Sequence, residues 1–195
     1  MPQRDHSAES EIILAVLDGD TDQFGVLAER YGPALFRFAD GRLGNQSLAE
    51  EATQEALLSA FKSLHTYDSR YSFRTWLWTI LLNQCKRQYR RQQVSDRTEA
   101  DVLANQHVSA EPSPEQQAIQ NEYRVQLNRL LDQLPPTQAD ALRLRFFGDL
   151  TFQEIADAMQ CSLGTAKNRV KAGLQKISYE LADFQPIVNQ ARSKS

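Results

Sequence analysis

The sequence predicts an all-α protein made of two small helical domains joined by a flexible linker, with a helix-turn-helix in the C-terminal domain. Apolar residues recur at helical spacing along most of the chain, and the alternation typical of strands is absent. Glycine and proline, which interrupt helices, number only 8 and 7 among 195 residues. Residues 92–114 break the apolar pattern with a polar stretch that ends in Glu111-Pro112-Ser113-Pro114, a composition typical of a linker.

This break divides the chain into segments. We expect an N-terminal helical domain over residues 10–91, the linker over 92–114, a C-terminal helical domain over 115–182 and a frayed tail over 183–195. The hydrophobic content of 41% is enough for compact cores in such domains.

Composition narrows the possible functions. The net charge of −3 and the pI near 5.7 are unusual for a protein that holds DNA alone, because phosphate contacts supply much of such affinity. Its basic residues must be concentrated, or a partner must contribute. Cys85 and Cys161 lie far apart, without metal-ligand spacing and without a secretion signal before them, so we expect no disulfide, no metal site and no cofactor. No apolar run approaches a membrane span, and the chain is therefore predicted to be soluble and cytoplasmic.

The first helix with a distinctive surface is predicted to begin at Ser47. Ser47 and Glu50 fit a capping box, in which a hydroxyl and a carboxylate satisfy backbone amides of the first turn. The face expected to be buried comprises Thr53, Leu57, Ala60, Phe61 and Leu64. Another face carries an acidic strip with one aliphatic residue, formed by Glu51, Gln54, Glu55 and Leu58 with Lys62 beyond them. Such a strip is either a solvated helix face or a docking site.

The next helix carries a row of aromatic, polar and basic side chains at spacings of three and four residues. The row consists of Trp76, Thr79, Asn83, Lys86 and Arg90, and Arg87 and Arg91 extend its basic end. An indole can stack on an exposed base, an asparagine can read a base edge and cations can bind phosphates, so the row suits single-stranded nucleic acid. The alternative is a tryptophan that packs on a neighbour while the cations face water. A separate apolar stripe comprises Trp78, Leu82, Cys85 and Tyr89.

Two helix-start signals about eleven residues apart predict the helix-turn-helix. Thr151 and Glu154 fit a capping box, and the helix that follows buries Phe152, Ile155, Ala156 and Met159. Ser162 is the expected N-cap of the second helix, whose buried stripe is Ala166, Val170, Leu174, Ile177 and Leu181. This leaves Thr165, Asn168 and Lys171 pointing outward, with Lys167 and Arg169 on the flanks. A second helix of this kind docks in the major groove, whereas the alternative is an ordinary helical hairpin with a solvated basic face.

Taken in order, these stretches resemble one known family over about residues 10 to 182. The stretch Phe73-Arg74-Thr75-Trp76-Leu77-Trp78-Thr79-Ile80, with Asn83 and the basic run to Arg91, is similar to the promoter-melting segment of bacterial sigma factors of the extracytoplasmic-function group. The family's opening helices resemble Asp22-Gln23-Phe24 through Tyr31 to Leu43-Gly44, and its polymerase-binding segment resembles Ala49-Glu50-Glu51-Ala52-Thr53-Gln54-Glu55. Its upstream-element reader resembles Leu134-Pro135-Pro136, Leu142-Arg143-Leu144-Arg145-Phe146, Leu150-Thr151-Phe152-Gln153-Glu154-Ile155-Ala156 and Gly164-Thr165-Ala166-Lys167-Asn168-Arg169.

The resemblance implies a transcription initiation factor that binds RNA polymerase core and directs it to a restricted set of promoters. By that similarity the strip of Glu51, Gln54, Glu55 and Leu58 docks on the coiled coil of the largest polymerase subunit. Trp76, Asn83 and Lys86 hold the opened strand of the minus 10 element, and the loop Tyr67 to Ser72 helps to pocket a flipped base. Lys167, Asn168, Arg169 and Lys171 read the duplex at minus 35. The linker, with Asp96, Glu99 and Asp101, threads the RNA channel, and an anti-sigma protein is a possible further partner.

Two departures from the family pattern limit what the resemblance implies. The acidic residue followed by two aliphatics in the family's polymerase-binding helix is Glu51-Ala52-Thr53 here. Position 168 is asparagine where the family often has a small hydroxyl residue, and asparagine can make a bidentate contact to adenine that serine cannot.

Rival functions are a helix-turn-helix repressor and an enzyme. The repressor predicts tight binding to a palindromic duplex without polymerase, and a stacking platform on the other domain argues against it. An enzyme is disfavoured because His6, His65 and His107 are isolated and no glycine-rich phosphate loop is present.

Overall fold

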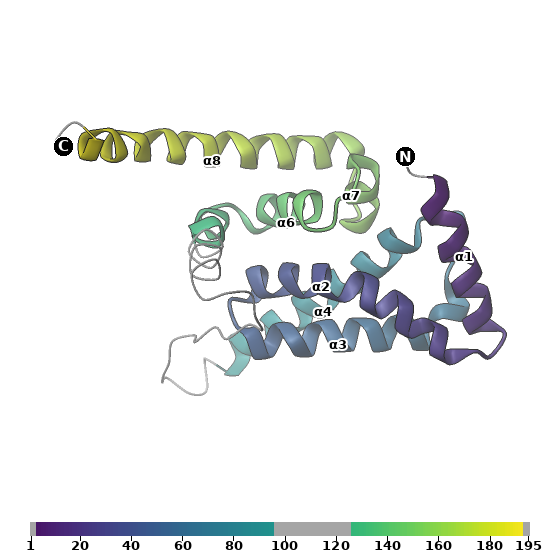
Figure 1. The fold of residues 1–195 in the computed structure, drawn as a ribbon. Helices are drawn as coiled ribbons and strands as arrows, with labels where there is room; N and C mark the ends of the chain where they lie inside the picture. Colours follow the sequence, from purple (N-terminus) through teal and green to yellow (C-terminus); the bar gives the residue numbers. More distant parts are fainter. Residues whose placement is uncertain (1–2, 96–125, 193–195) are drawn as a thin grey trace.

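The computed structural model describes residues 3–95 and 126–192, and within these ranges the regular structure is entirely helical. The N-terminal domain comprises α1 (Gln3–Leu17), α2 (Phe24–Leu43), α3 (Gln46–Lys62) and α4 (Phe73–Ser95), with short 3-10 turns at Thr21–Gln23 and Leu64–Thr66. In the C-terminal domain residues 126–132 are helical, and α6 (Pro136–Phe146), α7 (Phe152–Ala158) and α8 (Leu163–Arg192) follow. Figure 1 shows α8 and α6 above α2 and α4, with α3 on the far side of the N-terminal domain. Most of the predicted linker, residues 96–114, lies outside the described residues.

The start of α3 differs from the predicted capping box. Gly44 ends α2 in the left-handed conformation at φ 63°, and Asn45 follows in an extended conformation. The Asn45 side chain accepts a hydrogen bond from the Leu48 amide at 3.0 Å and is therefore the N-cap. Ser47 already lies in the first turn, so the prediction that it caps the helix was wrong. Glu50 instead accepts a hydrogen bond from the Gln46 side chain at 3.0 Å.

The N-terminal core forms where small residues of α3 let α2 and α4 approach closely. Four alanines of α3 are buried: Ala49, Ala52, Ala56 and Ala60. Thr53 is buried as predicted, and its hydroxyl donates to the Ala49 carbonyl at 2.7 Å. Of the other residues of the predicted face, Ala60 and Leu64 are buried, while Leu57 and Phe61 are half-buried. The buried face of α3 is therefore centred on its alanines.

The helix-turn-helix forms as predicted at both of its start signals. The Thr151 hydroxyl accepts from the Glu154 amide at 3.2 Å, and the Glu154 carboxylate accepts from the Thr151 amide at 2.8 Å, which completes the capping box. The Ser162 hydroxyl accepts from the Thr165 amide at 3.1 Å, as an N-cap does. Gln160 adopts a left-handed conformation at φ 52°, which reverses the chain between α7 and α8.

The buried stripe of α8 departs from the prediction beyond its second turn. Ala166 and Val170 are buried, but Leu174 is 40% exposed and Gly173 is buried in its place. The reason is a close approach of α8 to α6, since a Cβ on Gly173 would lie 2.7 Å from Leu142 Cδ1. The helix also continues to Arg192, past residue 182 where its domain was predicted to end. The side chain of Leu181, the last residue of the predicted stripe, lies outside the described side chains.

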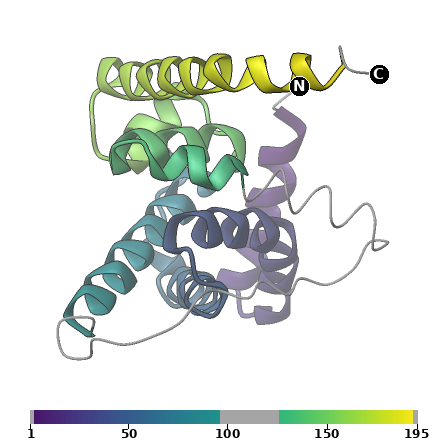
Figure 2. The same cartoon turned by 90° about the vertical axis from the view of Figure 1, so that its left-hand side faces the viewer.

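The two domains pack directly against each other, which the sequence analysis did not anticipate. Helix α4 contacts α7, and α2 contacts α6, so that buried residues of both domains form one continuous cluster. Figure 2 shows the C-terminal domain seated on α2 and α4. Three residues of the apolar stripe predicted for α4, Trp78, Leu82 and Cys85, are buried, whereas Tyr89 is 52% exposed at the edge of this contact.

Candidate nucleic-acid and polymerase interfaces

The predicted row on α4 lies along one accessible face of the helix. Asn83, Lys86, Arg87 and Arg90 are exposed, and Trp76 and Thr79 are half-buried. The hydroxyl of Thr79 donates to the Thr75 carbonyl at 2.8 Å, so its hydrogen is already used within the helix. The amide of Asn83 and the cations that follow it are therefore the groups of this row most available to a ligand.

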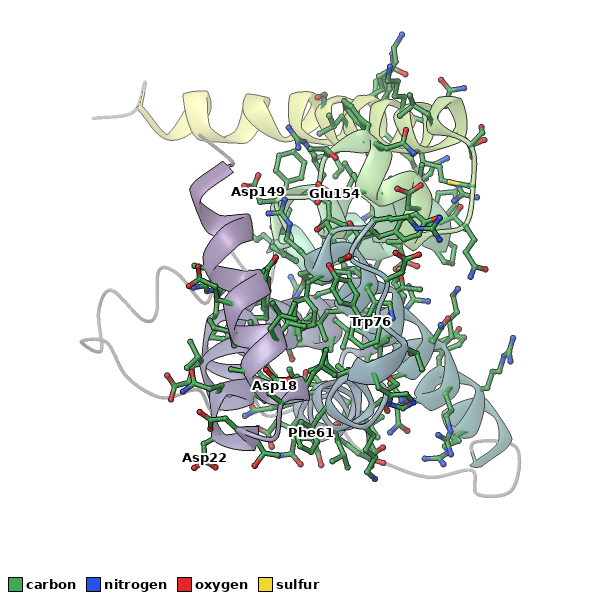
Figure 3. All side chains as sticks on the ribbon, turned by 90° about the vertical axis from the view of Figure 1, so that its right-hand side faces the viewer. Asp18, Asp22, Phe61, Trp76, Asp149 and Glu154 are labelled. Atoms are coloured by element: carbon green, nitrogen blue, oxygen red, sulfur yellow. The ribbon has the colours of Figure 1, made fainter. Side chains whose placement is uncertain are left out.

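Trp76 takes part in an aromatic cluster that sequence reasoning missed. Its ring centroid lies 5.5 Å from that of Tyr67 and 5.7 Å from that of Phe73, and the Tyr67 and Phe73 rings are 5.6 Å apart in an edge arrangement. Tyr31 of α2 completes the cluster at 5.9 Å from Phe73. The indole of Trp76 therefore packs against two other rings and is still partly exposed to solvent. Figure 3 shows Trp76 near the middle of the molecule. The high density of aromatic residues between 67 and 78 was the available signal.

The loop before α4 is held in shape by its own side chains. The Tyr67 hydroxyl donates to the Tyr71 carbonyl at 2.7 Å, and burial, followed by the nearby carboxylate of Glu9, raises the pKa of Tyr67. Asp68 pairs with the Arg70 guanidinium and accepts from its backbone amide at 3.0 Å. A preorganised loop of this kind loses little conformational entropy when it accepts a ligand.

Helix α1 is fixed beside this loop by a buried carboxylate. Glu9 is buried, accepts a hydrogen bond from the Tyr31 hydroxyl and lies 3.7 Å from an Arg30 guanidinium nitrogen. Burial, followed by the hydrogen bond to Glu9, raises the pKa of Tyr31, so the phenol keeps the proton it donates to Glu9 well above neutral pH. The contact anchors α1 to the helix that also supports the aromatic cluster.

The acidic strip on α3 is accessible along its whole length. Glu51, Gln54 and Glu55 are exposed, and Leu58 is 44% exposed among them. Glu51 lies 3.8 Å from an Arg91 guanidinium nitrogen of α4, a pair whose members are both half-exposed. An exposed pair of this kind contributes little to stability, so Glu51 remains free to exchange partners. An aliphatic side chain framed by carboxylates is suited to a partner with an apolar centre and basic surroundings.

The start of α8 presents a basic face. Lys167, Asn168 and Lys171 are exposed, while Thr165 and Arg169 are half-buried. The hydroxyls of Thr165 and Ser162 are 2.8 Å apart, so Thr165 belongs to the cap, and an Arg169 guanidinium nitrogen lies 4.0 Å from the Met159 sulfur. Three of the five predicted upstream-reading side chains are therefore fully available, and two also support the fold.

Comparison with known proteins identifies the family. Residues 27–94 match Sigma-70 region 2, and residues 124–177 match Sigma-70, region 4. The sigma factor EcfG of Rhodopseudomonas palustris is 30% identical over 148 residues, which cover 75% of this chain and 78% of that protein. The chain belongs to the extracytoplasmic-function group of bacterial RNA polymerase sigma factors. It is accordingly a factor for promoter-specific transcription initiation with RNA polymerase, and not an enzyme.

One further relative and one solved structure are similar to this chain over most of their length. The sigma-H factor of Pseudomonas aeruginosa is 27% identical over 190 residues, covering 94% of this sigma factor and 97% of that one. A solved structure of CnrH in complex with the cytosolic domain of CnrY has the same fold, with a TM-score of 0.68 at 19% identity over 88% of this chain and 96% of that chain. Within the described residues, none of the helices of this sigma factor is long and apolar enough to cross a membrane.

Proposed function

We propose that the α4 row, the α8 face and the α3 strip each bind a different partner during initiation. The α4 row, with the loop Tyr67 to Ser72, binds the opened strand of the minus 10 element, and the α8 face around Lys167, Asn168 and Lys171 reads the minus 35 duplex. The α3 strip docks on the coiled coil of the largest polymerase subunit. The observation that carries the proposal is the exposure of Asn83, Lys86, Arg87 and Arg90 on the helix that also carries the half-buried Trp76. Working with polymerase, the protein acts in the cytoplasm.

An anti-sigma protein is a further proposed partner. Two structures with this fold were solved as complexes, CnrH with the cytosolic domain of CnrY and RpoE of Bartonella quintana with the anti-sigma factor NepR. An apolar groove between α7 and α8, lined by Phe152, Val170 and Leu174 beside Lys167 and Lys171, offers a surface for such a partner.

Run-off transcription with purified core polymerase tests the initiation function. The template is the DNA upstream of the gene for this protein, with and without the protein, and a discrete new transcript is expected. A protein that binds a palindromic duplex without polymerase and fails to bind core would support the repressor alternative instead.

The α4 assignment is tested with Asn83→Ala against Arg37→Ala, an exposed position on α2 outside the proposed surfaces. We expect Asn83→Ala to reduce permanganate reactivity of the melted strand while core binding is unchanged. An unchanged footprint with Asn83→Ala would remove this residue from the melting surface.

The α8 assignment is tested with Lys167→Ala against Lys176→Ala, a cation of the same helix whose ammonium donates to the Gln133 carbonyl. Loss of one phosphate contact should lower the slope of log affinity against log salt by about 0.9. Transcription should fall with Lys167→Ala only on templates that carry the upstream element, and an equal loss on a template without it would contradict the role.

The α3 assignment is tested with Glu55→Lys, with Glu29→Lys on α2 as an exposed control of the same charge change. Glu55→Lys should weaken co-elution with core polymerase, because it places a cation where the partner surface is expected to be basic. Undiminished co-elution would reject the strip as the docking surface.

A further inference from the structure

A carboxylate lies on the buried face of α1. Glu9 is 5% exposed, and the next members of the same helix face, Ile13 and Val16, are apolar and also buried. Burial of a carboxylate costs free energy unless the group is paired and hydrogen-bonded, so an apolar residue would be the simpler choice for packing alone. The acid at position 9 therefore points to a role for the contacts that it makes.

Glu9 contacts α2 and lies close to the loop before α4. Its carboxylate accepts a hydrogen bond from the Tyr31 hydroxyl and lies 3.7 Å from an Arg30 guanidinium nitrogen. Its charge also contributes, after burial, to the raised pKa of Tyr67, which places the two groups near each other. Helix α1 contacts the 3-10 turn Leu64–Thr66 as well, and this turn leads directly into Tyr67. Glu9 is thus placed to act on the loop through two of its neighbours.

The Tyr31 ring links Glu9 to the aromatic cluster around Trp76. Its centroid lies 5.9 Å from that of Phe73, which is 1% exposed and is the first residue of α4. The Phe73 ring in turn lies 5.7 Å from the Trp76 ring and 5.6 Å from the Tyr67 ring. Side chains packed this closely cannot shift independently of one another. The hydrogen bond to Glu9 therefore holds one end of a chain of rings that reaches the accessible indole.

Affinity for a single strand and selection of a base place different demands on such a site. Cations such as Lys86 and Arg90 bind phosphates, which carry no sequence information. Selection requires that the groups around the base are held within about 0.5 Å by packed and hydrogen-bonded neighbours. Loss of the Glu9 contact should therefore affect selection more than affinity.

We propose that Glu9 is a positioning residue for selection of a base in the minus 10 element. Its hydrogen bond to Tyr31 fixes the tilt of the Tyr31 ring on Phe73. Phe73 then holds Trp76 and the loop Tyr67 to Ser72 in the geometry that accepts one base better than the others. Glu9 acts only through these groups, because it is itself buried. The proposal rests on the proposed function of the α4 row and this loop.

Base selection is measured with the holoenzyme and labelled single-stranded oligonucleotides. Each position of the minus 10 element is varied through the four bases, and the readout is the ratio of affinities for the best and the worst base at the most selective position. Glu9→Leu should lower this ratio about 2- to 10-fold, the value of one hydrogen bond, with affinity for the worst base nearly unchanged. Glu9→Gln should be intermediate, because it keeps an acceptor oxygen but loses the charge. Glu11→Leu and Glu11→Gln, at an exposed carboxylate of α1, should leave the ratio unchanged.

A double-mutant cycle tests whether Glu9 acts through Tyr31. Tyr31→Phe removes the hydroxyl and keeps the ring that contacts Phe73. The double variant Glu9→Leu with Tyr31→Phe should lower the ratio no further than Glu9→Leu alone, because both changes remove the same hydrogen bond. Losses that multiply in the double variant would show independent effects and overturn the proposed path through Tyr31.

A contribution to stability alone predicts a different pattern. A smaller folded fraction lowers the apparent affinity for every oligonucleotide by the same factor and leaves the ratio unchanged. Urea unfolding of each variant shows the temperature range in which it is folded, and the ratios are compared within that range. If Glu9→Leu does not fold, Tyr31→Phe carries the test. A wild-type ratio in folded Tyr31→Phe would overturn the proposal.

Asn83→Ala separates failure of this proposal from failure of the proposed function. The wild-type holoenzyme should bind the minus 10 oligonucleotide more tightly than a scrambled strand, and Asn83→Ala should weaken that binding. If neither result is obtained, the α4 row does not bind the opened strand, and both proposals fail. If both results are obtained while Glu9→Leu keeps the wild-type ratio, the positioning role of Glu9 is rejected and the function stands.

Discussion

Replacement of Trp76 separates its packing role from its stacking role. The Trp76 ring contacts two aromatic neighbours, Tyr67 and Phe73, and such ring pairs contribute about 0.5–1.5 kcal/mol each. Trp76→Ala should therefore lower the free energy of unfolding of the free protein by about 1–3 kcal/mol from these pairs. Loss of a base stack should cost a further ~1–3 kcal/mol in binding, or about 5- to 150-fold in affinity for a single strand.

The two losses are measured on different species. Urea unfolding of the free protein reports the packing contribution, and binding of a labelled single-stranded minus 10 oligonucleotide to the holoenzyme reports the stacking contribution. Trp76→Phe is the matched control, because it retains an aromatic ring for both contacts and should lie between the wild-type protein and Trp76→Ala in each assay. If Trp76→Ala unfolds more easily but the holoenzyme binds the oligonucleotide as tightly as before, the indole only supports the loop, and the stacking argument fails.

Three further predictions concern the helix-turn-helix. Thr151→Ala should lower the free energy of unfolding by about 1 kcal/mol because the cap hydroxyl is lost, and Thr151→Ser should retain most of it; equal unfolding midpoints for all three proteins would contradict the capping argument. Gly173→Leu should cost about 1–3 kcal/mol, because its Cβ meets Leu142, whereas Leu174→Ala should cost much less in the same denaturation assay. Burial opposes ionisation of Glu154, but hydrogen bonds from Thr151 and the Arg74 charge outweigh it and lower its pKa. Its stabilising contribution should be complete above the unfolded value of about 4.3 and be lost as pH falls through the folded value, a loss that Glu154→Gln should abolish in urea titrations across this range.

Features that depend on neighbours in sequence were predictable. The capping box at Thr151 and the cap at Ser162 formed as expected, because the hydroxyls and the amides they satisfy are three residues apart. The exposure of Asn83, Lys86 and Lys167 followed in the same way from helical periodicity. The predicted cap at Ser47 did not form. Asn45, two residues earlier, accepts the hydrogen bond from the Leu48 amide, so α3 begins directly after Asn45.

Features that depend on helix packing were less predictable. Helical periodicity allows either Gly173 or Leu174 of α8 to face the core, because the two residues are neighbours in the chain. The sequence favours Leu174, which has the larger apolar side chain. In the structure Gly173 faces the core and Leu174 is exposed, because α6 approaches so closely that only a residue without a side chain fits against Leu142. Tyr89 is exposed for a related reason: the C-terminal domain covers α4 at Trp78 and Cys85 but leaves the edge of the contact open.

The sequence by itself determined that the chain is helical, where its helix-turn-helix begins and that Glu55, Asn83 and Lys167 lie on exposed helix faces, since all of these follow from local spacing and local caps. Only the tertiary structure decided that the two domains close on each other. Arg42 and Asp140 are 98 residues apart in the chain, and Arg74 and Glu154 are 80 residues apart. No local pattern pairs such residues, because their meeting depends on which faces of α2 and α4 pack against α6 and α7. The contact between the domains therefore depends on the complementarity of two surfaces, where charge, close glycine contacts and a buried tryptophan coincide.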